Sequence, residues 1–185
     1  GGLPYMFHHR VQAMRIFFRM IHSPRALFVA ALLIGLGMFA GGVAIGHLLR
    51  LAACPLCILQ RMLYLSLASS ATLGLLVSEY RTGRIIASLL MLASTSCGIF
   101  VAAYQTYIQR FAQDVQCSGE AAWWELFVDW AGEHAPLLFQ ANGLCSDPAW
   151  KFISLSIAEW SLIAFSVLTL LALYMLYGYA VKNRQ

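Results

Sequence analysis

The segment Cys54-Pro55-Leu56-Cys57 places two thiols at a spacing suited to redox chemistry. Pro55 fits the first position of a helix, because its missing N–H would have no partner there anyway. Cys54 is therefore expected to cap the helix and Cys57 to lie in its first turn. The free N–H groups and the positive end of the helix dipole favour a thiolate at Cys57. The pattern predicts a reactive cysteine pair at a helix start.

Arg61 follows Cys57 by four residues, which places both on one helix face. A charge inside a membrane is costly and indicates a function, here stabilising a thiolate and binding a polar head group. Two other interpretations are a structural disulfide and a metal site completed by Cys117 and Cys145. Haem attachment requires a His where Ile58 stands. Arg61 also opposes a divalent cation, so redox chemistry is favoured.

Cys117 and Cys145 form a second pair in a long polar segment. A disulfide between them would close a loop and stabilise the fold by about 3 kcal/mol. An exposed loop disulfide is also open to attack by an external thiolate. Taken alone, Cys117 and Cys145 are consistent with either a structural or a redox-active disulfide. The presence of a second pair at the helix start favours electron transfer between the two pairs. Cys97 lies inside an apolar run and is expected to pack against another helix.

The composition of the segments around these cysteines indicates membrane-spanning helices. Hydrophobic residues make up 61% of the chain and charged residues 11%, whereas soluble domains have about 45–50% and about 25%. A bilayer span needs about 20 apolar residues. We expect a basic cytoplasmic or interfacial segment over 1–25, then a four-helix transmembrane domain over 26–185 with spans at 26–49, 57–77, 84–107 and 157–179.

The positions of Lys and Arg predict the orientation, because inside-facing segments are rich in them. They concentrate before the first span, between spans two and three, and after span four, at Arg10, Arg15, Arg19, Arg25, Arg81, Arg84, Lys182 and Arg184. Both termini are therefore expected in the cytoplasm. The loop 108–156 and all four redox cysteines are then periplasmic.

Trp123, Trp124, Phe127 and Trp130 approximate one face of a short helix inside this loop. Aromatic rings favour the membrane interface, so this helix is expected to lie flat on the outer leaflet. An ordinary loop helix packed on the bundle explains the pattern equally well. The predicted fold class is an all-α membrane protein, a four-transmembrane-helix bundle with a long periplasmic loop that contains a short interfacial helix.

These motifs together resemble the disulfide bond formation protein B (DsbB) family of bacterial inner membranes. The resemblance covers nearly the whole chain and rests on Cys54-Pro55-Leu56-Cys57 with Gln60-Arg61, Gln109, the pair Cys117 and Cys145, Trp150 and Phe152 behind Cys145, and Glu159-Trp160. The C-x-x-C-x-x-x-R spacing with four spans is fairly specific, whereas the loop tryptophans are not.

The resemblance implies a membrane thiol:quinone oxidoreductase that reoxidises a periplasmic thioredoxin-fold dithiol oxidase, DsbA-like. Cys117 would form the mixed disulfide with that partner, and Cys145 would pass electrons to Cys54. Cys57 would lie nearest the quinone ring and make the adduct or charge-transfer contact, with Arg61 on the quinone oxygen. A DsbA-like partner is a strong oxidant, so its reoxidation needs an electron acceptor with a still higher reduction potential. The glutathione couple has a far lower potential and cannot serve.

Gln105 stands where some family members carry a His, and it is expected to contact the quinone. The quinone is ubiquinone or menaquinone, and the protein is expected to be a monomer with no metal and no nucleic acid partner. Three alternatives are kept: the DsbI sub-branch with a dedicated partner, a vitamin K epoxide reductase-like enzyme, and a non-catalytic membrane assembly factor with structural disulfides. In the vitamin K family the loop pair precedes C-x-x-C, the reverse of the order seen here.

Overall fold

The computed structural model describes residues 23–111, 123–148 and 150–180. Its elements, in chain order, are α2 (Pro24–Leu48), α3 (Pro55–Leu76), α4 (Arg81–Phe111), α5 (Trp123–His134), α6 (Pro136–Phe139), β1 (Lys151–Phe152), β2 (Leu155–Ser156) and α7 (Ile157–Ala180). Within these residues, four helices, α2, α3, α4 and α7, are long and apolar enough to cross a membrane. The all-α membrane fold expected from the sequence is confirmed.

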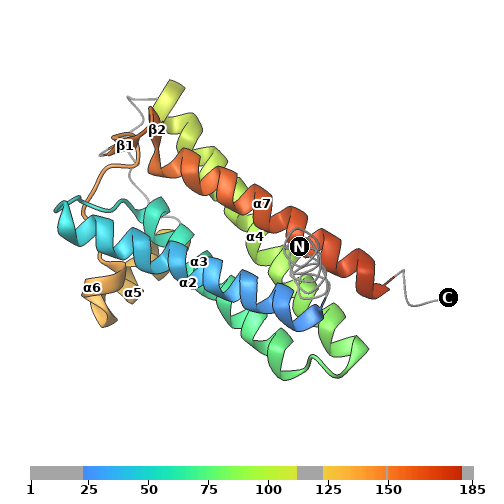
Figure 1. Ribbon diagram of the computed structural model, residues 1–185. Helices are drawn as coiled ribbons and strands as arrows, with labels where there is room; N and C mark the ends of the chain where they lie inside the picture. Colours follow the sequence, from blue (N-terminus) through green and yellow to red (C-terminus); the bar gives the residue numbers. More distant parts are fainter. Residues whose placement is uncertain (1–22, 112–122, 149, 181–185) are drawn as a thin grey trace, which may run out of the picture.

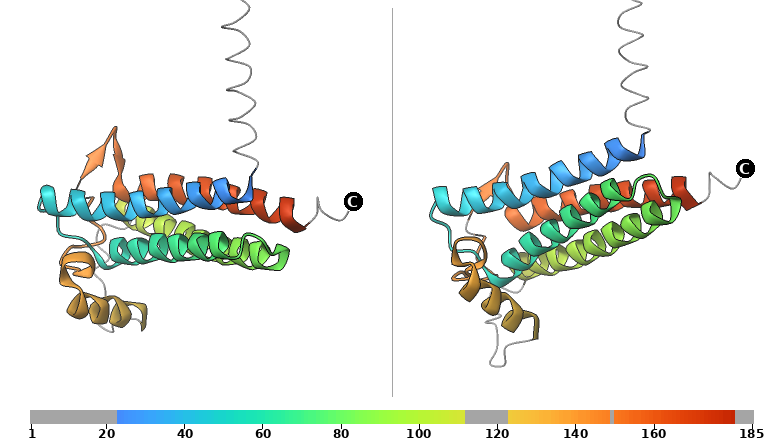
Figure 2. Two further views of the ribbon diagram at one scale, coloured as in Figure 1. Left: turned by 60° about the horizontal axis from the view of Figure 1, so that its bottom comes forward. Right: turned by 90° about the horizontal axis from the view of Figure 1, so that it is seen from below.

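The four long helices lie side by side as a bundle, and α5, α6 and the β1–β2 hairpin gather at one end of it (Figures 1 and 2). α4 packs against both α3 and α7, and α2 packs mainly on α3. The predicted spans 84–107 and 157–179 lie within α4 and α7, and the predicted spans 26–49 and 57–77 each run one residue past the end of α2 and α3. α4 extends beyond its predicted span at both ends. The end of the bundle that carries the loop elements is the end at which α3 begins.

Small residues let the helices approach closely, as in other membrane bundles. A Cβ at Gly74 of α3 would lie 2.3 Å from the ring of Phe28, so α2 seats that ring against the glycine. Gly98 of α4 receives Phe165 of α7 in the same way, at 2.4 Å. Phe165 also stacks on Tyr64 with ring centroids 4.2 Å apart. These ring-on-glycine contacts fix the rotation of each helix.

The expectation that Cys97 packs against another helix is wrong. Its side chain is exposed on α4, and the neighbouring Gly98 takes the inward position. One residue corresponds to about 100° of helix rotation, so only one of these two positions can face α7. The apolar sequence around Cys97 and Gly98 does not by itself indicate which of the two faces α7.

The aromatic residues of α5 divide between two faces rather than sharing one. Trp123, Phe127 and Trp130 are exposed, spaced four and three residues apart. Trp124 instead packs against the buried cluster around Cys54, and Val128 beside it is buried. The helix therefore packs on the bundle through one face and presents rings outward through the other.

Candidate functional site

The start of α3 holds Cys54 and Cys57 as the sequence predicts. Cys54 is the N-cap, with extended backbone, and its sulfur accepts a hydrogen bond from the backbone N–H of Cys57 at 3.3 Å. Pro55 occupies the first helical position. The two sulfur atoms lie 3.1 Å apart. Capping thus brings both thiols to the end of the helix where the dipole favours negative charge.

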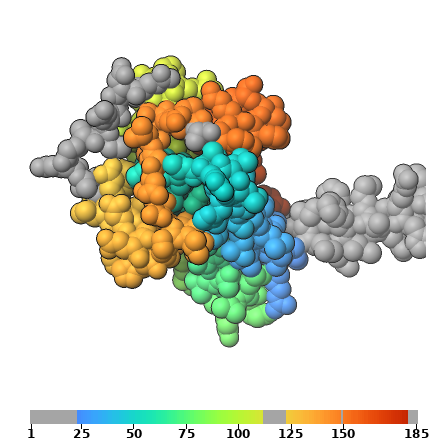
Figure 3. Space-filling view, turned by 90° about the vertical axis from the view of Figure 1, so that its left-hand side faces the viewer, coloured from blue at the N-terminus to red at the C-terminus, as the bar shows by residue number. Residues whose placement is uncertain are grey.

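The loop after α6 docks on the segment just before α3 and brings in a third cysteine. The backbone N–H groups of Asn142 and Gly143 both donate to the carbonyl oxygen of Ala53, each at 2.9 Å. Two residues further on, Cys145 is buried and hydrogen-bonded to Cys54. Figure 3 shows the orange loop segment against the cyan residues that precede α3. Three sulfur atoms from two distant segments therefore meet, with Cys54 in the middle.

Only glycine fits at position 143. A Cβ there would lie 2.3 Å from the carbonyl oxygen of Ala52, closer than real Cβ atoms approach any other atom. The contact is with backbone, which cannot turn away as a flexible side chain can. Gly143 therefore sets how closely the loop carrying Cys145 approaches Cys54.

Cys54 and Cys145, which lie outside the helices in the described part of the chain, differ in thiol pKa. The single S–H of Cys54 can be donated to Cys145 or to Cys57, and these two hydrogen-bond partners together with burial raise the pKa of the Cys54 thiol. The same bond from Cys54 lowers the pKa of Cys145, more than burial raises it. In the reduced protein the proton stays on Cys54, and Cys145 is the better nucleophile of this pair.

Arg61 is half-buried one turn below Cys57 and lies against α2. Its Nη2 donates to the carbonyl oxygen of Gly42 at 2.8 Å, and its Nη1 donates to that of Leu138 in α6 at 3.1 Å. A Cβ at Gly46 would lie 3.1 Å from Nη2, so the glycine spacing on α2 makes room for the guanidinium. Sequence reasoning missed this G-x-x-x-G pair, whose spacing is the signal that could have found it.

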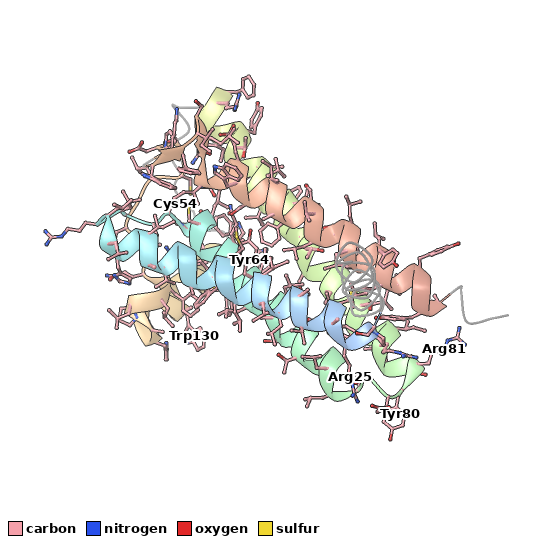
Figure 4. The ribbon with its side chains drawn as sticks, viewed as in Figure 1. Arg25, Cys54, Tyr64, Tyr80, Arg81 and Trp130 are labelled. Carbon is pink, nitrogen blue, oxygen red and sulfur yellow. The ribbon has the colours of Figure 1, made fainter. Side chains whose placement is uncertain are left out.

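A cavity of about 370 Å³ opens beside these groups. Its lining includes Cys57 and Arg61 on α3, Gly41 on α2, and the rings of Trp150 and Trp160 near the start of α7. Ligand sites are typically concave and mostly apolar, with few polar groups, and measure about 300–1,000 Å³. In Figure 4, Cys54 and Tyr64 lie toward the loop end, far from Arg25 and Arg81 at the other. The cavity thus lies at the end of the bundle where the cysteines meet.

Comparison with known proteins identifies the family of the chain. The family model for "Disulfide bond formation protein DsbB" matches residues 24–175. A relative named disulfide bond formation protein B from Dechloromonas aromatica is 38% identical over 144 residues, 77% of this chain and 86% of its own. Its namesake from Albidiferax ferrireducens is 32% identical over 157 residues, 84% of this chain and 89% of its own.

The chain belongs to the DsbB family. It is a multi-pass membrane protein of disulfide bond formation. The family name implies an oxidoreductase that makes disulfides. The matched region contains Cys54, Cys57, Arg61, Gly143 and Cys145.

Gln105, expected to contact a quinone, lines the same cavity but bonds to sulfur. Its amide nitrogen donates to Cys54 at 3.3 Å and to Cys57 at 3.1 Å. Gln60, which sequence reasoning quoted only as part of the family likeness, donates to the amide oxygen of Gln105 at 2.7 Å. Gln60 follows Cys57 by three residues, and this spacing could have indicated that both side chains lie on one face of α3. Cys117, the fourth redox cysteine expected in this DsbB-family chain, lies outside the described residues.

Proposed function

We propose that the protein is a thiol:quinone oxidoreductase that reoxidises a periplasmic thioredoxin-fold dithiol oxidase, DsbA-like, and reduces a membrane quinone. The observation that carries the proposal is the juxtaposition of three sulfur atoms with an apolar, arginine-bearing cavity. A structural disulfide alone would need neither the third sulfur nor a ligand-sized cavity beside it. Family membership supports the same class of activity.

The proposed route conserves electrons and protons at each step. The partner's dithiol reduces the Cys117–Cys145 disulfide, so the partner leaves oxidised and both loop cysteines become thiols. The Cys145 thiolate then attacks Cys54 of the Cys54–Cys57 disulfide, which forms a Cys145–Cys54 bond and releases Cys57 as a thiolate. Cys117 next attacks Cys145, which restores the loop disulfide and leaves Cys54 reduced. Cys54 and Cys57 then re-form their disulfide, and a quinone held beside Cys57 and Arg61 would accept the two electrons and two protons that they give up and would leave as a quinol.

The residues around the cavity fit a quinone ring. Two of the five N–H donors of Arg61 bond to backbone carbonyls, and the guanidinium can offer others to a ring oxygen. Gly41 and Gly42 keep one wall flat, since neither has a side chain to fill the space. Gln105 also lines the cavity and is proposed to contact the quinone as well as the sulfurs.

Charge at the two ends of the bundle supports an orientation with the cysteines in the periplasm. The far end holds Arg25, which pairs with Glu79, and Arg81, which donates to the last carbonyls of α7. At the cysteine end, Arg110 pairs with Glu159. Arg50 and Lys151 also lie at the cysteine end, whereas five further basic residues precede α2 or follow α7 in the sequence, namely Arg10, Arg15, Arg19, Lys182 and Arg184. Because basic residues favour the cytoplasmic side, the start of α2 and the end of α7 are proposed to face the cytoplasm of a bacterial inner membrane, with the protein acting as a monomer.

The experiment uses the full chain in lipid nanodiscs with a reduced DsbA-like partner and either ubiquinone or menaquinone. Partner oxidation is expected only when a quinone is supplied, with one quinol formed per partner disulfide. Cys57→Ser is expected to abolish turnover, and Cys97→Ser to retain it, because Cys97 is exposed on α4 away from the site. Partner oxidation that proceeds equally without quinone, or full activity of Cys57→Ser, would overturn the proposal.

A further inference from the structure

Two glutamines on adjacent helices form a buried pair beneath the sulfur atoms. Gln60 of α3 is 2% exposed and Gln105 of α4 is 1% exposed. Buried polar groups cost free energy unless they are hydrogen-bonded. Here the amide nitrogen of Gln60 donates to the amide oxygen of Gln105 at 2.7 Å. The pair is therefore held together by a directional bond in the apolar interior.

That bond decides which end of Gln105 faces the cysteines. An amide side chain has one oxygen that accepts and one nitrogen that donates two hydrogen bonds. Because the oxygen of Gln105 accepts from Gln60, its nitrogen points to the sulfurs of Cys54 and Cys57, at 3.3 and 3.1 Å. Both N–H bonds of Gln105 are then directed at sulfur. The reverse orientation would present an oxygen, which repels a sulfur anion.

We infer that Gln60 is a positioning residue that holds Gln105 with its N–H groups toward the cysteine pair, so that Cys57 is stabilised as it leaves the disulfide. The inference rests on the proposed function, because that reaction is what releases Cys57. Gln60 is proposed to act through Gln105, because its side-chain nitrogen donates to Gln105 and not to either sulfur. A neutral amide pair supplies donors to a sulfur anion without the cost of adding another charge inside the membrane.

The position of Gln60 on α3 suits this role. Gln60 and Arg61 follow Cys57 by three and four residues, so both lie one turn below it. Arg61 turns toward α2 and the loop, where its bonds to Gly42 and Leu138 hold it. Gln60 turns toward α4. The sulfur is thus approached from two sides, by a charge and by an oriented amide.

The test replaces Gln60 by Glu, which has the same shape but only accepts hydrogen bonds when ionised. The carboxylate is expected to attract the N–H groups of Gln105 and turn its oxygen to the sulfurs. Gln60→Met keeps the bulk and removes the donor. Gln140→Glu makes the same chemical change at an exposed glutamine that ends α6 and serves as the control. Each full-length protein is reduced and treated with short pulses of iodoacetamide over a pH series, and labelling at Cys57 is located by peptide fragmentation.

In Gln60→Glu, the labelling rate of Cys57 at neutral pH is expected to fall about tenfold, a shift of the pH profile by about one unit toward higher pH. Gln60→Met is expected to shift the profile in the same direction by less, and Gln140→Glu to leave it in place. A Gln60 that merely fills space predicts an unshifted profile in Gln60→Met, and that result overturns the inference even if Gln60→Glu fails to fold.

Quinone turnover by the unmodified protein separates the two proposals. If it turns over and the Gln60 variants label Cys57 as the unmodified protein does, the positioning role is wrong and the proposed function stands. If the unmodified protein reduces no quinone, the proposed function fails, and with it the inference that depends on it.

Discussion

The backbone N–H of Gly143 donates to the carbonyl oxygen of Ala53 at 2.9 Å, and this bond joins the loop to the residue just before Cys54. The N–H of Asn142 donates to the same oxygen. Cys145, two residues after Gly143, is buried against Cys54 as a result. Backbone hydrogen bonds, rather than a side-chain contact, therefore set the distance between Cys145 and Cys54, across which the proposed exchange would occur.

Gly143→Ala is expected to slow the exchange between Cys145 and Cys54. The added Cβ would lie 2.3 Å from the carbonyl oxygen of Ala52, so the loop must move away. A misplacement of about 1 Å can reduce a rate by about 100-fold. We expect partner oxidation to fall by about 10- to 100-fold, measured as turnover in nanodiscs, while a small dithiol that reduces the Cys54–Cys57 disulfide directly still drives quinone reduction.

Gly178→Ala provides the matched control for this change. A Cβ at Gly178 in α7 would meet no atom of the described residues within 4 Å, and both turnovers should match those of the unmodified protein. Equal losses of partner-driven and dithiol-driven turnover in Gly143→Ala would show damage beyond the loop contact and contradict this role of the backbone hydrogen bonds.

The reaction of Cys145 with alkylating reagents is expected to depend on Cys54. The hydrogen bond from Cys54 lowers the pKa of Cys145, so its thiolate persists to lower pH than that of an ordinary cysteine. Cys54→Ala removes this donor and should move the labelling profile of reduced Cys145 to higher pH. Mass spectrometry of labelled peptides measures the shift. Cys97→Ala should not move the profile, and an unmoved profile in Cys54→Ala would refute the proposed proton sharing.

Arg61→Lys is expected to weaken quinone binding and loosen α6 together. A lysine keeps the charge but cannot bond to both Gly42 and Leu138 through a planar fork. Loss of the hydrogen bond that the guanidinium is proposed to offer the quinone costs about 1.5–3 kcal/mol, so the KM for quinone should rise by at least about tenfold. Amide hydrogen exchange at residues 137–139, measured by mass spectrometry, should become faster.

Arg84→Lys is the comparison for that variant. Arg84 lies over the ring of Tyr179 at the other end of the bundle, 5.2 Å from its centroid. Its replacement should change neither the KM nor the exchange of α6. A raised KM in Arg61→Lys with unchanged exchange would mean that the bond to Leu138 does not hold the loop.

The local parts of the site could be predicted from the sequence. The N-cap at Cys54 and the shared face of Cys57 and Arg61 follow from proline placement and helix periodicity, which involve only neighbouring residues. Four apolar stretches sufficed for the four long helices.

The remaining contacts depend on how distant segments meet. The meeting of Cys54 and Cys145 requires the loop to dock through Gly143, a backbone contact that leaves no compositional pattern. The orientation of Gln105 toward sulfur requires a particular rotation of α4, and the packing of Phe165 of α7 against Gly98 helps to set that rotation. The same rotation explains why Cys97 faces outward, contrary to expectation.

Photolabelling with an azidoquinone tests the central claim most directly, namely that the cavity beside Cys57 and Arg61 is where a quinone is reduced. The full chain in nanodiscs is illuminated with the reagent, digested, and mapped by mass spectrometry. We predict labels on cavity-lining residues such as Met38 and Ile45 of α2 and Tyr64 of α3, and these labels should disappear when excess ubiquinone or menaquinone is present. Labels confined to the exposed outer surface, or labels that excess quinone does not remove, would contradict the account.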